Sequence, residues 1–178
     1  MALLPLQKYG SSLLRRKTKE VIEFSNLQPL LNDMLETMYQ EEGIGLAANQ
    51  VGINQSLFVV DVSNIEDETD TKPRIFINPK IIDREGSVDI EEGCLSVPEI
   101  RAVITRAENI TIEYLDVKQK KQTDQYSGML ARVIQHEYDH LQGKYFTDYL
   151  SLTKKSMIQK RLVEILQKGI PSKSITIK

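Results

Sequence analysis

The sequence has 178 residues, of which 40% are hydrophobic and 27% are charged, as is typical of a soluble globular domain. Its single cysteine excludes an internal disulfide, and the lack of 18 successive apolar residues excludes a transmembrane helix. The first ten residues lack the basic and apolar pattern of a secretory signal, so we expect a cytoplasmic protein without a membrane partner.

The first predicted element is a helix over residues 27–42, where leucine and methionine recur every three or four positions. Ser25 is placed to cap this helix, and Gly43 is expected to end it. A glycine-rich turn follows, and then Ser56–Val62 has the composition of a strand. The acidic segment Asn64–Pro73 is predicted to be a solvated loop.

Short β-type segments come next, at residues 74–78, 80–85, 103–106 and 110–115. Two further helices are predicted, one from about Ser127 to Gln142 and one over residues 153–168. This order favours an α+β fold, with short and mostly antiparallel sheets around a central helix that lies between an N-terminal and a C-terminal helix. We expect one catalytic domain at residues 1–168, including the helix 153–168, and a short basic tail at 169–178.

The segment QHEYDHL places His136, Glu137 and His140 on the second of these three helices. Histidines at positions i and i+4 lie about 40° apart around a helix and one turn along it, so both rings can reach one metal ion. The chain has two histidines in all, and both are in this motif. The spacing therefore indicates a metal site, against the alternative of two unrelated histidines that share a helix face.

Glu137 falls in the middle of an apolar stripe on that helix, and the two histidines lie at the edge of the stripe. The stripe consists of Leu130, Val133, Ile134 and Leu141. A carboxylate that faces the core requires a polar or positive partner. A water molecule bound to the metal would supply one, and the alternative is a buried pair with an arginine.

A catalytic metal site usually has three protein ligands, and the sequence offers two candidates for the third. Cys94 is the only cysteine, and its thiolate would be a strong ligand, although a lone cysteine is often a small buried hydrophobic residue. Glu164 follows His140 by 24 residues, as in zinc endopeptidases that complete an HExxH site with a downstream glutamate. The spacing alone does not choose between them.

Three segments in order, GIGLAANQ (43–50), EGCLS (92–96) and QHEYDHL (135–141), resemble the three motifs of the peptide deformylase family. The similarity covers most of residues 10–165, and the helical C-terminus resembles the bacterial type 1 form. The resemblance implies hydrolysis of the N-formyl group from the formylmethionine of nascent peptides, with release of formate. A phosphate-loop lysine is absent from the glycine-rich turn, so a nucleotide site is not indicated, and we expect no DNA partner.

By this resemblance, Cys94, His136 and His140 bind one divalent metal ion, and Glu137 is the general acid and base. The metal is expected to be Fe(II) in the cell, with Zn, Ni or Co able to replace it. The resemblance also assigns stabilisation of the formyl oxygen to the Gln50 side-chain amide and the Leu95 backbone N–H.

The expected substrate contacts are Ile44, Gly45, Arg101, Met129 and Val133. Arg132 departs from the aliphatic residue often found in the family, and its place off the apolar stripe predicts that it points outward. If it does not, the methionine pocket is narrower or more polar than usual. Asp139 is expected to be a solvated surface carboxylate and not a group that orients a ligand.

The charge is unevenly distributed along the chain. Between Ser151 and Lys178 there are seven basic residues and one acidic residue, a net charge of +6, which leaves −8 on the preceding 150 residues. The C-terminal helix either packs its leucines on the domain with its lysines in water, or also contacts ribosomal RNA. Besides peptide deformylase, two classes stay open: a zinc endopeptidase that uses Glu164, and a non-catalytic metal-binding or RNA-binding protein.

Overall fold

The computed structural model describes residues 2–65 and 72–178, so most of the expected acidic loop Asn64–Pro73 lies outside the described residues. The predicted α+β class is confirmed. In chain order, the elements are η1 (Ser12–Arg15), α1 (Leu27–Gln40), β1 (Gly45–Ala47), η2 (Ala48–Val51), β2 (Leu57–Val60), β3 (Arg74–Glu85), β4 (Val88–Cys94), β5 (Val97–Arg106), β6 (Asn109–Leu115), β7 (Lys121–Ser127), α2 (Gly128–Leu141), η3 (Phe146–Tyr149), α3 (Leu152–Lys168) and β8 (Ile175–Ile177).

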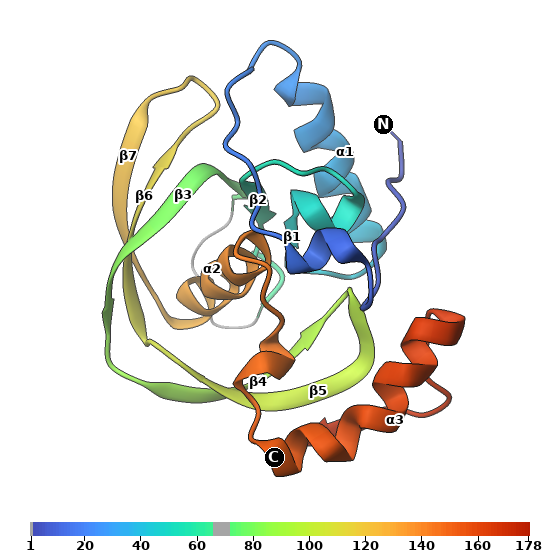
Figure 1. Ribbon diagram of the computed structural model, residues 1–178. Coiled ribbons are helices and arrows are strands. Elements are labelled where there is room, and N and C mark those ends of the chain that lie inside the picture. The colour runs from blue at the N-terminus through green and yellow to red at the C-terminus, as the bar shows by residue number, and fades with distance from the viewer. Residues whose placement is uncertain (1, 66–71) are drawn as a thin grey trace.

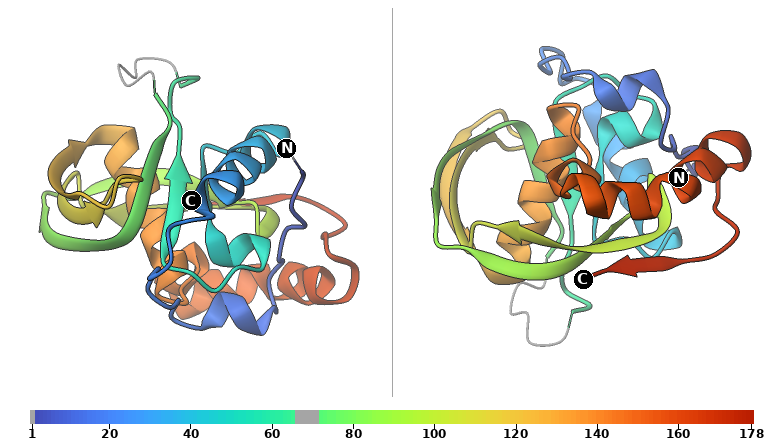
Figure 2. Two further views of the ribbon diagram at one scale, coloured as in Figure 1. Left: turned by 90° about the horizontal axis from the view of Figure 1, so that it is seen from above. Right: turned by 60° about the horizontal axis from the view of Figure 1, so that its bottom comes forward.

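The strands form two sheets on either side of α2. One sheet has the order β1-β2-β3-β6-β7 and is antiparallel throughout, and the other has the order β4-β5-β8, in which β8 pairs with β5 in parallel. Figure 1 shows α2 at the centre, with β3, β6 and β7 curving round one side and β4 and β5 passing below. Figure 2 shows that α3 lies on the side of the molecule away from β6 and β7.

The helix α2 is enclosed by these elements, and eleven of its 14 residues are buried. Its apolar residues pack with Phe58 and Phe76 of the five-stranded sheet, whose rings are stacked with centroids 4.9 Å apart. A second core joins α3 to β5, and a third joins α1 to β1 and β2. Because nearly all of α2 is covered, its polar residues must also find partners inside the protein.

Several elements differ from their predicted bounds. The segments 74–78 and 80–85 form the single strand β3, which is irregular between Ile77 and Lys80, where its register with β6 shifts. The N-cap of α1 is Asn26 and not Ser25. The strands β4 and β7 were not predicted, because VDIEEGC and KQTDQYS are too polar to have a strand composition. Pairing with β5 and β6 compensates for this low propensity.

The C-terminal helix ends at Gly169, whose φ of 78° lies in the left-handed region, as its predicted role in ending the helix requires. The segment 169–178, expected to be a short basic tail, contains β8, which adds a strand beside β5. Within residues 2–65 and 72–178, no helix is both long enough and apolar enough to cross a membrane.

Candidate metal centre

The centre of the site is formed by three side chains from two elements. His136 and His140 lie one turn apart on α2, with ring centroids 5.0 Å apart. Cys94 ends β4, and its Sγ lies 3.1 Å from Nε2 of His140. The ligand atoms of these three side chains all lie within 4.8 Å of one another, and the described residues contain no second group of this kind. A thiolate with two imidazoles is a donor set that suits Zn or Fe(II), so these residues fit a metal ion.

Glu137 lies beside these histidines and is only 3% exposed. Its Oε2 is buried and has no hydrogen-bond partner in the part of the chain that the structure describes. Burial raises the pKa of Glu137 to about 7, against the opposing positive charges of His136 and Arg106. Gly45 leaves room for this carboxylate, since a Cβ at position 45 would lie 2.5 Å from Glu137 Oε1. A carboxyl group with this pKa can accept and return a proton near neutral pH.

A buried ion network supports His136 from its far side. Nδ1 of His136 lies 3.0 Å from Oε2 of Glu92, and Arg106 donates from Nε to Oε1 of Glu92 at 2.6 Å. Burial would raise the pKa of Glu92, but hydrogen bonds from His136 and Arg106 outweigh it and hold this pKa well below its usual range. The ionised Glu92 therefore accepts the Nδ1 proton of His136, which leaves Nε2 free to bind a metal.

Glu92 had no predicted role, although it opens the EGCLS segment. Its position two residues before the candidate ligand Cys94 was the only signal in the sequence. The buried arginine–carboxylate pair considered for Glu137 is found at Glu92 instead, which accepts from both Arg106 and Arg132.

Arg132 does not point outward, and that prediction is wrong. The residue is 3% exposed, and its Nη1 donates to Oε1 of Glu92 at 2.8 Å. It also donates to the carbonyl oxygens of Ile104 and Val88, each at 2.6 Å, and so ties α2 to β5 and β4. The apolar stripe of the helix did not predict this burial, because the β4–β5 hairpin also covers the helix face beside the stripe.

Asp139 is also buried, contrary to its prediction as a solvated carboxylate. It is 7% exposed and accepts hydrogen bonds from Nη1 of Arg106 at 2.7 Å and from the Tyr149 hydroxyl at 2.9 Å. Its link to His136 is indirect and runs through Arg106 and Glu92.

Gln50 and Leu95 flank Cys94 from two separate segments. The Oε1 atom of Gln50 accepts from the Ala47 backbone N–H at 2.8 Å, which fixes the orientation of the amide. Its Nε2 then donates toward Ser96 Oγ at 3.2 Å and toward Cys94 Sγ at 3.6 Å. Leu95 begins the two-residue turn that follows Cys94. Both predicted donors therefore adjoin the candidate metal ligands.

The site opens into a cavity of about 680 Å³. The predicted substrate residues that line it are Ile44, Gly45, Arg101, Met129 and Val133. Cys94, His136 and Glu137 line the same space. Arg101 is exposed and pairs with Glu91 at 3.1 Å, so it belongs to the rim. The cavity thus brings the five residues together with Cys94, His136 and Glu137.

Glu164 lies outside the metal-binding group. Its carboxylate accepts from the backbone N–H of Ser172 at 2.8 Å and from the hydroxyl of the same residue. Glu164 therefore joins the end of α3 to the segment after it, and the geometry favours Cys94 as the third ligand.

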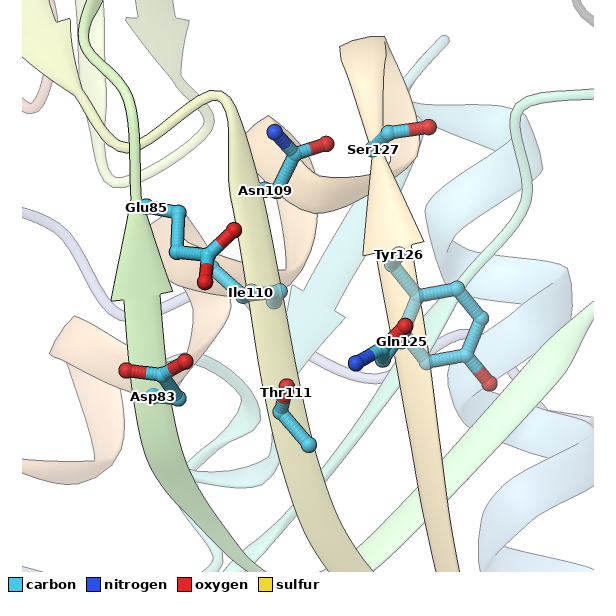
Figure 3. Close-up of a pocket in the computed structure, with 8 residues that line it drawn as sticks. All are labelled: Asp83, Glu85, Asn109, Ile110, Thr111, Gln125, Tyr126 and Ser127. Carbon is cyan, nitrogen blue, oxygen red and sulfur yellow. The ribbon is translucent and has the colours of Figure 1, made fainter.

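A second hollow, of about 350 Å³, lies on the sheet formed by β3, β6 and β7. Figure 3 shows its lining residues standing on these three neighbouring strands, among them Asp83, Glu85 and Asn109. These three side chains are exposed, and none of the metal-binding residues reaches this hollow. It is separate from the candidate active site.

Comparisons with known proteins identify the family of this chain. The sequence model of a family described as polypeptide deformylase matches residues 3–156. A peptide deformylase of Xylella fastidiosa (strain M12) is 48% identical over 166 residues, covering 91% of this chain and 95% of its own. A peptide deformylase of Flavobacterium psychrophilum is 41% identical and covers 93% of this chain and 91% of its own.

Solved structures with the same fold include two bacterial peptide deformylases. The crystal structure from Thermus thermophilus has a TM-score of 0.86 at 38% identity, covering 94% of this chain and 99% of its own. The crystal structure from Legionella pneumophila has a TM-score of 0.84 at 37% identity, covering 94% of this chain and 98% of its own.

Proposed function

Because this chain belongs to the peptide deformylase family, we infer that it removes the formyl group from the N-terminal formylmethionine of nascent peptides and releases formate. The reaction is hydrolysis of a linear amide. The observation that carries the residue assignments below is that Cys94, His136 and His140 group together beside Glu137, whose buried Oε2 has no hydrogen-bond partner among the described residues. Cys94, His136 and Glu137 line one cavity.

We propose that Cys94, His136 and His140 hold one divalent metal ion. Such an ion would supply Lewis acidity, which makes water a nucleophile near neutral pH. Fe(II) is the metal that we expect in the cell, with Zn, Ni or Co able to substitute, because sulfur and imidazole donors accept all four. The hydrogen bond between His136 and Glu92 supports this role, since it orients the ring and occupies Nδ1, so that Nε2 is the nitrogen available to a metal ion.

Glu137 is proposed to move the proton. Its carboxylate takes a proton from the attacking water and delivers it to the amine nitrogen that leaves the formyl carbon. The pKa of about 7 supports this role, because the group exchanges a proton with little free-energy change at neutral pH. Its burial on α2 keeps the carboxylate in one place during the reaction.

The formyl oxygen becomes negatively charged as water attacks, and the proposed donors to it are the amide of Gln50 and the backbone N–H of Leu95. The hydrogen bond from the Ala47 N–H holds the Gln50 amide in place before substrate arrives. Donors that are fixed in advance stabilise the transition state without a reorganisation cost.

The cavity suits an extended peptide with an apolar first side chain. The strands β1 and β4 are edge strands of the two sheets, and both contribute residues to the cavity, so their backbone groups can pair with the substrate. We propose that Ile44, Met129 and Val133 contact the methionine side chain, that Gly45 allows the close approach of the peptide, and that Arg101 contacts it farther along.

Formate release from formyl-Met-Ala-Ser tests this function, with anaerobically purified protein whose metal content is measured. We expect release by the wild type and none by Glu137→Ala with one metal ion per chain. Glu164→Ala is the matched control and should retain activity, whereas Cys94→Ala should lose the metal. No release by a wild type fully loaded with iron or nickel would contradict the assignment. Metal that stays bound in Cys94→Ala and is lost in Glu164→Ala would favour the endopeptidase alternative, because Glu164 would then be the third ligand.

We also propose a cytoplasmic location and contact with ribosomal RNA through the basic C-terminal segment. The charge of +6 between Ser151 and Lys178 supports an electrostatic and salt-sensitive interaction. Glutamine at four positions should weaken cosedimentation with ribosomes: Lys154, Lys155, Lys160 and Arg161. The control removes the same charge from other surfaces, at Lys17, Lys19, Lys118 and Lys120. Equal binding by both variants would refute the contact.

A further inference from the structure

Three successive residues near the N-terminus bind the two segments that carry the proposed formyl-oxygen donors. The backbone N–H of Gln7 donates to the carbonyl oxygen of Gln50 at 2.7 Å, and that of Tyr9 donates to the carbonyl oxygen of Ser96 at 2.8 Å. Figure 1 shows this segment, in dark blue, passing close to the point where β4 and β5 meet. Residues 7–9, called the N-terminal segment below, therefore link the motif GIGLAANQ (43–50) to the motif EGCLS (92–96) from outside both sheets.

Lys8, between these two residues, faces the site with its side chain. Its Nζ donates to the carbonyl oxygen of Leu95 at 2.9 Å, and Lys8 lines the same cavity as the metal-binding residues. The other two arginine or lysine residues in the cavity lining, Arg101 and Arg132, pair with carboxylates. The bond of Lys8 is to a neutral carbonyl, so its positive charge is not neutralised by that contact.

The Leu95 carbonyl belongs to a turn whose second residue, Ser96, is buried and accepts a hydrogen bond from Gln50 Nε2 at 3.2 Å, whereas the side-chain hydrogen bond at the Leu95 carbonyl comes from Lys8. Leu95 and Ser96 are the two turn residues of the β4–β5 hairpin, and the hairpin closes with Cys94 paired to Val97. Hairpin tips are ordinarily among the more mobile parts of a protein. Here the N-terminal segment holds both carbonyl oxygens of the turn, through Lys8 at Leu95 and through a backbone N–H at Ser96.

We propose that Lys8 is a positioning residue that fixes the β4–β5 turn, so that the Leu95 N–H is directed at the formyl oxygen. This inference rests on the proposed function, because the oxygen to be stabilised is that of the formyl group. A rigid donor contributes more to the transition state than a mobile one, since the site does not reorganise as charge develops. The ammonium group also adds a positive charge beside the same turn.

Lys8→Met tests the proposal, because it keeps the aliphatic stem and removes the donor and the charge. With formyl-Met-Ala-Ser and one metal ion per chain, we expect kcat to fall about tenfold while KM stays within about twofold, as for a loss of transition-state stabilisation. Lys8→Arg retains a donor and should stay within about twofold of the wild type. Lys17→Met, at an exposed lysine that lies after η1 and outside the cavity lining, should behave as the wild type.

A second measurement does not depend on turnover. Hydrogen exchange of residues 93–97, followed by mass spectrometry, should be faster in Lys8→Met than in the wild type, in Lys8→Arg or in Lys17→Met. A Lys8→Met variant with wild-type kcat and wild-type exchange overturns the proposal, and so does a kcat loss that merely follows metal loss. If the wild type released no formate, the proposed function would fail, and the exchange rates would still decide whether Lys8 holds the turn.

Discussion

Replacing Gly45 with alanine should displace the carboxylate of Glu137 while leaving the proposed metal ligands in place. A Cβ atom at position 45 would lie 2.5 Å from Oε1 of Glu137 and 2.8 Å from Cγ1 of Val133, and both distances are too short to be tolerated. The φ of Gly45 is not in the left-handed region that favours glycine, so the substitution acts by this contact and not by backbone strain. Both neighbours are buried on α2, so the carboxylate must move within a packed site.

The size of the effect follows from the displacement. An ordinary contact of about 3.4 Å requires the carboxylate to move by roughly 0.5–1 Å, and misplacing a reacting group by about 1 Å can cost on the order of a hundredfold in rate. We therefore expect kcat to fall about a hundredfold, which is about 2.7 kcal/mol in activation free energy. Metal content should stay at one ion per chain, because the atoms nearest to a Cβ at position 45 belong to Glu137 and Val133 and not to the three proposed ligands.

Formate release under saturating substrate measures this change, with the metal quantified in each preparation. The control is Gly52→Ala, where the φ of 85° strains the new residue but the nearest atom is Nε2 of Gln7 at 3.6 Å. That variant should lose about 1 kcal/mol of stability and keep its kcat. A Gly45→Ala single variant within about twofold of wild-type kcat would refute the reasoning.

Three other predictions concern stability and metal affinity. In the metal-free protein, the pKa of Glu137 is raised from 4.5 to about 7, so stability falls as pH rises between these values, by about 3 kcal/mol in all. Glu137→Gln should therefore stabilise the protein at pH 8 and not below pH 4.5, and urea unfolding with no such pH dependence would contradict this. Arg132→Met removes a buried partner of Glu92 and should lower the free energy of unfolding by about 3 kcal/mol. Arg101→Met, at an exposed ion pair, should lower it by under about 1 kcal/mol. Equal losses for the two variants in urea unfolding would contradict the argument from burial. Glu92→Gln should lower metal affinity about 10–100-fold by weakening the orientation of His136, and chelator competition at wild-type affinity would refute that role.

The elements with strong local signals were predicted well. The helix α2 was expected from about Ser127 to Gln142 and extends from Gly128 to Leu141, because its apolar residues repeat at the helical period. The helix α3 was expected at 153–168 and is found at Leu152–Lys168, since Gly169 ends it by adopting a positive φ. The strands β4 and β7 were missed, because what makes them strands is their partners β5 and β6 and not their own composition.

The metal-binding group shows a similar division. The spacing of His136 and His140 on one helix face predicts from local geometry alone that both bind one metal ion, since four residues span about one turn. Local spacing did not decide whether Cys94 or Glu164 is the third ligand. Both are far from the two histidines in sequence, so only the long-range fold determines which of them lies near α2. The structure places Cys94 beside His140 and gives Glu164 a partner at Ser172.

The sequence by itself determined the motifs, the main helices and the chemical groups proposed for the active site, since these depend on residue type and short-range periodicity. Only the tertiary structure decided that Arg132 and Asp139 are buried and that Glu92 is held between two arginines behind His136. Helical periodicity divides a helix into an apolar and a polar face, which assumes that one face meets water. The β4–β5 hairpin covers the polar face of α2 as well, so its charged residues pair inside the protein.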